Sequence, residues 1–153
     1  MSFIARIQKG FTLLEVVIVL ALLSIITALL FSGFREYVAY QQFTQSVRDI
    51  QLTLQESQSS ARLSVGGVEH GVVFGSDTIT QFIGPVYTLG EPTNVIRTFS
   101  AIEMTPSLSG GGNEIVFSSL SGYPLVTGTV LISGTRYDGT VTLEVTAGGV
   151  VQY

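Results

Sequence analysis

Residues 9–34 read KGFTLLEVVIVLALLSIITALLFSGF, and this stretch decides the architecture of the chain. From Val16 to Phe34 there is no charged side chain in 19 positions. A helix of that length rises about 28 Å at ~1.5 Å per residue, close to the hydrocarbon thickness of a bilayer. We therefore expect residues 11–34 to form a helix that spans a membrane.

The charges on either side of this helix predict its orientation. Arg6 and Lys9 precede it, whereas Arg35 after it is offset by Glu36. Because positive flanks favour the cytoplasmic side, we expect residues 1–10 in the cytoplasm and everything after the helix across the membrane. The competing interpretation is a secretory signal peptide, whose apolar region has about 7–15 residues and ends near an Ala-x-Ala-like cleavage site. The run here is longer, and no such site follows it.

Glu15 is the one charged residue within the apolar stretch. A carboxylate at the centre of a membrane helix costs about 2.5–3.5 kcal/mol on insertion scales and less near an end, so a plain anchor has no use for it. If the chain were cut after Gly10, Phe11 would carry a new α-amine one helical turn from Glu15. In an assembly, that amine on one subunit would neutralise Glu15 on a neighbour, with little water to compete. Gly10 suits a cleavage site because it has no side chain to clash with a protease cleft.

These residues resemble the N-terminal processing motif of type IV pilins and type II secretion pseudopilins. A short basic leader, residues 1–10, ends in Gly10 and is followed by Phe11, Glu15 and a long apolar helix. The resemblance implies that a prepilin peptidase cleaves between Gly10 and Phe11 and N-methylates Phe11. It implies that Glu15 then pairs with a neighbour's amine during assembly, and that the partners are other pilins and an inner-membrane assembly platform. Many members of the family carry a proline near the position of Ser32, so a kink there is weaker in this chain.

The helix is predicted to continue as an amphipathic segment over residues 35–65. Apolar residues recur there at three- and four-residue steps, namely Tyr40, Phe43, Val47, Ile50, Leu54 and Ala61. Neither proline nor glycine interrupts the segment, and Gly66-Gly67 follows it. We expect this stripe to pack on the chain's own sheet, and a partner helix in a coiled assembly is the alternative.

Residues 66–153 are predicted to form a β-rich globular domain, because 15 of the 17 glycines lie after Val65 among many Thr, Val and Ile residues. The predicted strands are 68–74, 78–83, 86–89, 94–99, 114–118, 129–133, 140–146 and 150–152. A mobile loop is expected at 106–113 and a hairpin turn at 137–140. With no second helix between strands, the sheet should be antiparallel. The expected fold class is α+β: a long N-terminal helix whose C-terminal half packs on one antiparallel sheet or two small ones, as in pilins.

The composition limits the classes of function. Net charge is −4 and there is no cysteine, which excludes a disulfide scaffold and a thiol nucleophile. Cleavage after Gly10 would remove Arg6 and Lys9 and leave a more acidic chain, which argues against nucleic acid as a partner. His70 is the sole histidine and the acidic residues are scattered. We therefore expect no catalytic residues, no metal site and no cofactor.

Three functions stay open at this point. We expect a minor pilin or pseudopilin, a structural subunit of a type IV pilus-like or type II secretion filament. The globular part is similar to H-type pseudopilins and FimT-type minor pilins at the helix end, 55–61, and at the late strand, 141–145. The alternatives are a major pilin and a membrane-tethered ligand- or DNA-binding module that never polymerises. The expected location is the inner membrane, with the N-terminus cytoplasmic and the globular domain periplasmic, and then the filament.

Overall fold

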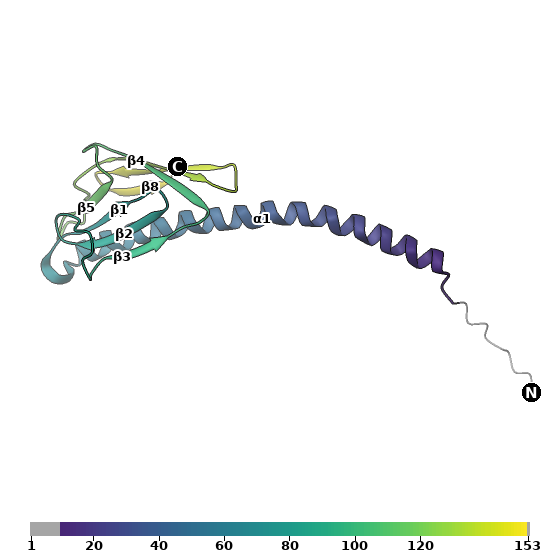
Figure 1. Cartoon of the computed structure of the whole chain (residues 1–153). Helices are drawn as coiled ribbons and strands as arrows, with labels where there is room; N and C mark the ends of the chain where they lie inside the picture. Colours follow the sequence, from purple (N-terminus) through teal and green to yellow (C-terminus); the bar gives the residue numbers. More distant parts are fainter. Residues whose placement is uncertain (1–9, 153) are drawn as a thin grey trace, which may run out of the picture. The chain divides into compact units, whose positions relative to one another are not determined.

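The computed structural model describes residues 10–152, and it confirms the α+β fold class. Helix α1 (Leu13–Arg62) is followed by the short 3-10 helix η1 (Val65–Gly67) and then by β-strands (Figure 1). The chain divides into two compact units, Met1–Tyr37 and Val38–Tyr153, and α1 contributes to both. The predicted leader, apart from Gly10, lies outside the described residues.

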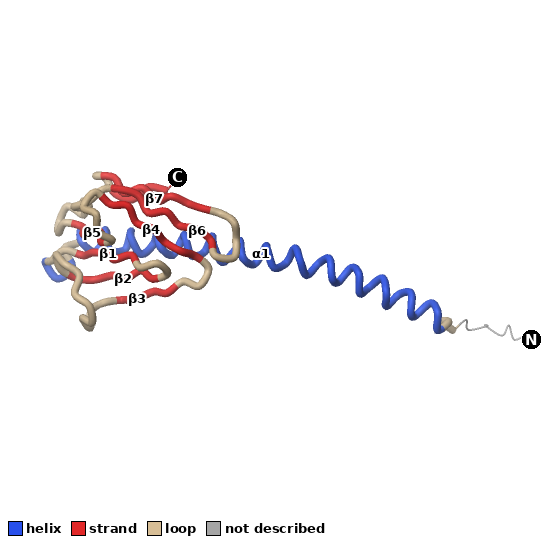
Figure 2. Tube along the Cα trace, turned by 45° about the horizontal axis from the view of Figure 1, so that its top comes forward, coloured by secondary structure: helices blue, strands red, loops and turns tan. Residues whose placement is uncertain are grey.

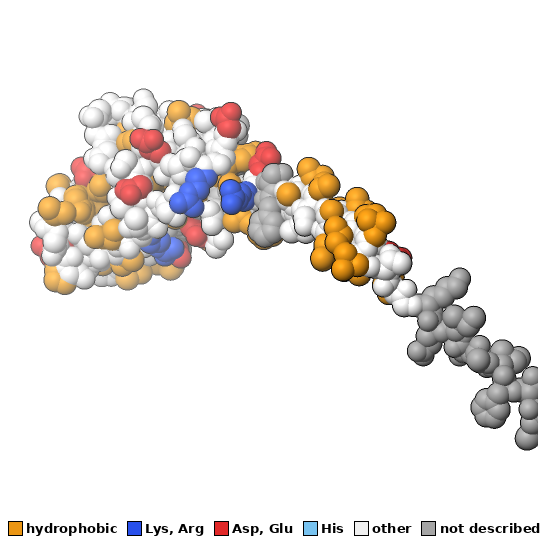
Figure 3. Space-filling view, turned by 45° about the vertical axis from the view of Figure 1, so that its right-hand side comes forward, with side chains coloured by type: hydrophobic (Ala, Val, Ile, Leu, Met, Phe, Trp, Pro, Cys, Tyr) orange, Lys and Arg blue, Asp and Glu red, His pale blue; other side chains and the backbone are white. Residues whose placement is uncertain are grey.

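In the first unit, α1 carries an exposed apolar surface. An 18-residue window of the helix has a mean hydropathy of 2.8, and none of that window is buried within the structure. Hydrophobic side chains cover the visible face of this segment in Figure 3. The hydroxyls of Ser24 and Thr27 donate to the carbonyls of Leu20 and Leu23, each at 2.7 Å, so they need no partner from a lipid environment. By length and composition, this segment can cross a membrane.

In the second unit, one face of α1 packs against two β-sheets (Figure 2). The buried apolar residues of this face are Ala39, Phe43, Val47, Ile50, Leu54 and Ala61. The predicted stripe therefore packs on the chain's own sheets, although Tyr40 is 44% exposed. Two hydroxyls on the buried face bond within the helix, since Ser46 donates to the Gln42 carbonyl and Thr53 to the Asp49 carbonyl.

Each sheet has four antiparallel strands. Sheet A has the order β3 (Val95–Thr98), β2 (Thr78–Ile83), β1 (His70–Phe74) and β5 (Glu114–Phe117). Sheet B has the order β4 (Ile102–Leu108), β6 (Gly128–Gly134), β7 (Thr140–Thr146) and β8 (Gly149–Gln152). Of the two arrangements expected for the globular domain, one antiparallel sheet or two small ones, the second unit has two small sheets.

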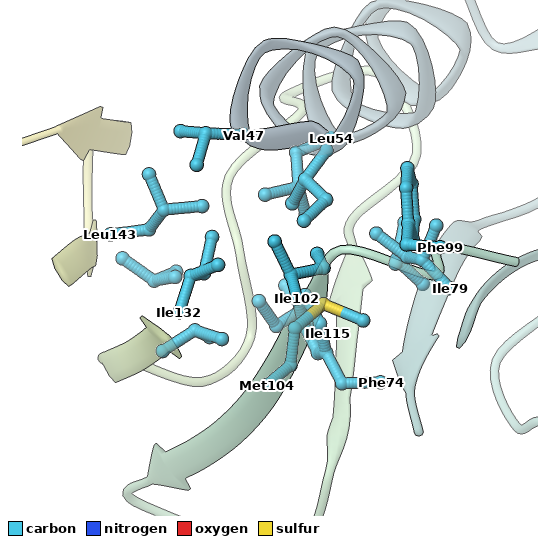
Figure 4. Close-up of a cluster of buried hydrophobic side chains, with 14 of the residues drawn as sticks. Val47, Leu54, Phe74, Ile79, Phe99, Ile102, Met104, Ile115, Ile132 and Leu143 are labelled. Carbon is cyan, nitrogen blue, oxygen red and sulfur yellow. The ribbon is translucent and has the colours of Figure 1, made fainter. Parts of the chain in front are cut away.

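The hydrophobic core lies between α1 and the two sheets (Figure 4). Because successive side chains of a strand point to opposite faces, every second residue reaches this core. Sheet A contributes Val72, Phe74, Ile79, Ile115 and Phe117, and sheet B contributes Ile102, Met104, Val130, Ile132, Leu143 and Val145. Burying one such large side chain is worth about 1.5–3 kcal/mol, so this shared core holds the helix and both sheets together.

Two predictions about strands are wrong. Strand β4 was not expected, because Pro106 lies inside it and proline lacks the N–H that a ladder needs. Pro106 is tolerated there because β4 is an edge strand of sheet B. Since β4 extends to Leu108, the loop predicted at 106–113 is shorter than expected. Residues 86–89, expected as a strand, belong to the β2–β3 loop, where the Asn94 amide donates to the Thr88 carbonyl at 2.8 Å.

The helix ends at Arg62, one turn before the glycines that were expected to end it. The loop at 118–122 caps this end: the Leu120 N–H donates to the Ala61 carbonyl at 2.9 Å, and the Gln58 amide donates to the Gly122 carbonyl at 3.0 Å. Gly122 has a φ of 65°, and a Cβ there would collide with the Arg62 side chain. Only glycine fits this position without displacing Arg62.

Two leucines on α1 test the contribution of the core. Leu54 is fully buried, whereas Leu52 is 53% exposed. We expect Leu54→Ala to lower the free energy of unfolding by about 2–5 kcal/mol, because it removes buried apolar surface and leaves a cavity. Leu52→Ala should change it by less than about 0.5 kcal/mol. Urea unfolding of the full chain in detergent micelles, followed by near-UV circular dichroism, measures both, and equal losses would contradict this description of the core.

Candidate functional site

The candidate site lies where the apolar helix begins. Gly10, Phe11 and Thr12 precede α1 in non-helical backbone, and all three are exposed. The side chain of Phe11 is 80% exposed. A protease binds its substrate as an extended strand, so a peptide bond in exposed, non-helical backbone is open to cleavage. The Gly10–Phe11 bond meets both conditions.

Gly10 has no structural role within the described part of the chain. A Cβ placed on it would meet no heavy atom within 4 Å, and its φ lies outside the left-handed region that favours glycine. The fold therefore gives no reason for a glycine at this position. Any requirement for glycine must come from a molecule that binds there.

Thr12 and Glu15 form the N-terminal cap of α1. The backbone N–H of Glu15 donates to Thr12 Oγ1 at 3.3 Å, and the N–H of Val16 donates to the Thr12 carbonyl at 3.3 Å. A Thr-x-x-Glu spacing at a helix start is the capping-box pattern, and a carboxylate in the first turn also complements the helix dipole. No role was expected for Thr12 from the sequence, although the Thr-x-x-Glu spacing is the signal for one.

Glu15 is exposed on the same turn as apolar side chains. Leu13 and Leu14 beside it are also exposed, at 83% and 68%. Within residues 10–152, Arg97 and Glu56 form an ion pair at 3.1 Å. Glu15 has no cationic partner in that range. Its carboxylate is therefore available to a cation on another chain. Phe11 lies in non-helical backbone two residues before α1, and Glu15 lies in the first turn of the helix.

Other polar residues singled out in the sequence lie elsewhere. His70 begins β1, is 7% exposed, and its Nε2 lies 2.9 Å from the Val65 carbonyl oxygen. Among the residues that the structure describes, no group of three or more His, Asp or Glu side chains is placed to hold a metal ion. The start of α1 is therefore the region where the exposed, chemistry-bearing residues identified from sequence come together.

One comparison with known proteins finds a match in this part of the chain. Residues 5–31 match the family model described as the prokaryotic N-terminal methylation motif. The N-terminal segment is thus of the type IV pilin-like class, which points to a structural subunit that a prepilin peptidase processes and that assembles with other pilins. The motif and the apolar helix fit a membrane-anchored N-terminus. No curated protein and no solved structure matches the chain, so the likeness of the globular part to H-type pseudopilins and FimT-type minor pilins is not confirmed.

The role of Thr12 as the cap of α1 can be tested by substitution. We expect Thr12→Val to weaken the first turn of α1 by about 1 kcal/mol, because the side-chain acceptor for the Glu15 N–H is lost. Amide hydrogen exchange at Glu15 should then become about fivefold faster. Thr27→Val is the control, since the Thr27 hydroxyl bonds within the helix. Unchanged exchange at Glu15 would show that Thr12 does not cap the helix.

Proposed function

We propose that this protein is a minor pilin or pseudopilin, a structural subunit of a type IV pilus-like or type II secretion filament. The observation that carries the proposal is the methylation motif at residues 5–31. Its supporting geometry is an exposed, non-helical Gly10–Phe11 bond directly before a capped apolar helix with Glu15 in its first turn. The absence of cysteine also differs from many major pilins, which carry a C-terminal cysteine pair, and this favours a minor subunit.

The first step in this function is proteolysis. A prepilin peptidase hydrolyses the Gly10–Phe11 bond, adding water to give a carboxylate on Gly10 and a protonated amine on Phe11. The amine then takes one methyl group from a sulfonium methyl donor, which leaves as a thioether, and releases a proton. Removal of residues 1–10 takes away Arg6 and Lys9, which hold the N-terminus on the cytoplasmic side. The new cation stands at the positive end of the α1 dipole, which is unfavourable by itself.

The second step is assembly through the helix. The carboxylate of Glu15 on a neighbouring subunit compensates the Phe11 amine, and in an apolar helix bundle this pair is screened little by water. The exposed apolar surface of residues 13–29 supplies the packing between helices once the subunit leaves the bilayer. We assign residues 11–34 to the membrane and the filament core, residues 35–65 to the amphipathic continuation, and residues 66–153 to the globular domain outside the cytoplasm.

Processing is tested at Gly10. We expect intact-mass analysis of the wild-type protein to give a chain that begins at Phe11 and carries one added methyl group. Gly10→Val should reduce cleavage by about 100-fold, because a branched side chain displaces the bond from the catalytic groups. Gly33→Val is the matched control, since a Cβ at Gly33 also meets open space. A mature chain that begins elsewhere, or normal processing of the Gly10 variant, would refute the proposal.

Assembly is tested at Glu15 with a substitution that separates its two roles. Glutamine also serves in a capping box, so Glu15→Gln keeps the helix start but removes the charge. We expect cleavage to continue and incorporation into sheared filaments to fall about tenfold or more, because losing one partner of a buried ion pair costs about 3–5 kcal/mol. Glu36→Gln, at an exposed position, should assemble normally. Equal filament content in both variants would exclude the pairing role.

A further inference from the structure

A crevice of about 190 Å³ lies between the last turns of α1 and the β3 side of sheet A, within the second unit. Its lining residues are Ser57, Ser60, His70, Gln81, Phe82, Ile83, Thr93 and Val95. The proposed filament function uses residues 10–34 and leaves this crevice without a role.

The register of sheet A explains why these side chains converge. His70 is paired with Ile83, and Gln81 with Val95. Paired residues in antiparallel strands share a face, as do residues two apart, so all four lie on one face. That face is turned to α1, because the Gln81 amide donates to the Thr53 carbonyl at 3.1 Å and to Ser57 Oγ at 3.3 Å.

His70 supplies an unused hydrogen-bond acceptor. Its Nε2 bonds to a carbonyl oxygen, which can only accept, so Nε2 carries the proton and Nδ1 of the neutral ring is an acceptor. In the described part of the chain Nδ1 has no hydrogen-bond partner. In that part of the chain, every side-chain nitrogen or oxygen that is fully shielded from solvent has a hydrogen-bond partner. His70 is only 7% exposed, but it lines the crevice and its unpartnered Nδ1 therefore keeps some contact with solvent.

The other lining groups limit the chemistry of such a ligand. No Lys, Arg, Asp or Glu lines the crevice. The charged groups beside it are Glu56, which accepts from the Gln81 amide at 3.3 Å, and Arg97, and these two already pair with each other at 3.1 Å. A charged ligand would therefore lose its hydration without an unpaired counter-charge. A purely apolar ligand would leave Nδ1 and the hydroxyls of Ser60 and Thr93 without partners. Ile83 and Val95 add an apolar wall. The fitting ligand is uncharged, has several hydroxyl groups and also has a C–H face.

We propose that this crevice binds one ring of a neutral carbohydrate. A ring hydroxyl donates to His70 Nδ1, other hydroxyls exchange hydrogen bonds with Ser60 and Thr93, and the C–H face packs on Val95. A second, open pocket of about 350 Å³ shares Phe82, Ile83 and Thr93 with the crevice, and its polar lining also includes Thr88, Glu91 and Asn94. It offers space for the next sugar along a glycan.

The single histidine makes the proposal directly measurable. Full-length protein labelled with ¹⁵N-histidine contains one imidazole, so its two nitrogen resonances report on His70 alone. The sample is held in lauryldimethylamine oxide micelles, which contain no sugar, at a pH of about 8, where free imidazole is neutral. Glucose, galactose and N-acetylglucosamine are titrated to about 50 mM, well above a millimolar Kd. We expect at least one of them to shift the Nδ1 resonance saturably and the Nε2 resonance less.

Adjacent serines provide a matched pair of variants. Ser60 lines the crevice, whereas Ser59 is exposed on α1 and does not. Ser60→Ala should weaken sugar binding about three- to tenfold, the effect of one neutral hydrogen bond, and Ser59→Ala should leave it unchanged.

Three results would overturn the proposal. The first is that none of the three sugars produces a saturable shift. The second is that acetate or trialanine saturates the Nδ1 shift and the sugars do not, which would assign the crevice to an anion or a peptide. The third is equal binding by the Ser60 and Ser59 variants. None of these results bears on cleavage at Gly10, so the proposed filament function is tested independently.

Discussion

The contact on which the second unit depends is the packing of α1 against both sheets. Each sheet has only four strands, and neither could bury its core-facing side chains without another element packed on them. The stripe that includes Phe43, Ile50 and Leu54 covers both faces at once. Strand β4 of sheet B also bonds to the turn between β1 and β2 of sheet A, where the Met104 N–H donates to the Ser76 carbonyl at 2.6 Å. The helix is therefore the common element of the core.

The same helix meets two different environments. Along residues 13–29 its apolar side chains are exposed all round, as a lipid or a bundle of like helices requires, whereas from Ala39 onward one face is buried and the other is polar. In the first turn of this helix, the backbone of Glu15 takes part in an interaction within the chain, and its side chain is open to an interaction with another chain. Its backbone N–H is part of the cap in the single chain, and within residues 10–152 its carboxylate has no ion-pair partner, which leaves it open to an interaction between chains.

Much of the architecture could be predicted because its signals are local. The charge-free run after Glu15 predicts a long apolar helix, the three- and four-residue spacing of Phe43 and Ile50 predicts its buried face, and the absence of a second helix predicts antiparallel strands. The errors concern strands whose status depends on neighbours. Pro106 suits a strand only because β4 is at an edge, and residues 86–89 form a loop because their backbone bonds to Asn94 rather than to another strand.

The candidate processing site could be proposed from the sequence alone, because it consists of nearby residues, Gly10 to Glu15, whose spacing is visible in the chain. The division of the strands into two sheets becomes apparent only in the folded chain, as does the position of Ser60, His70 and Val95 around one crevice. Those residues are far apart in sequence, and none of them belongs to a recognisable motif. Their convergence depends on strand register and on the docking of α1, which no local pattern encodes.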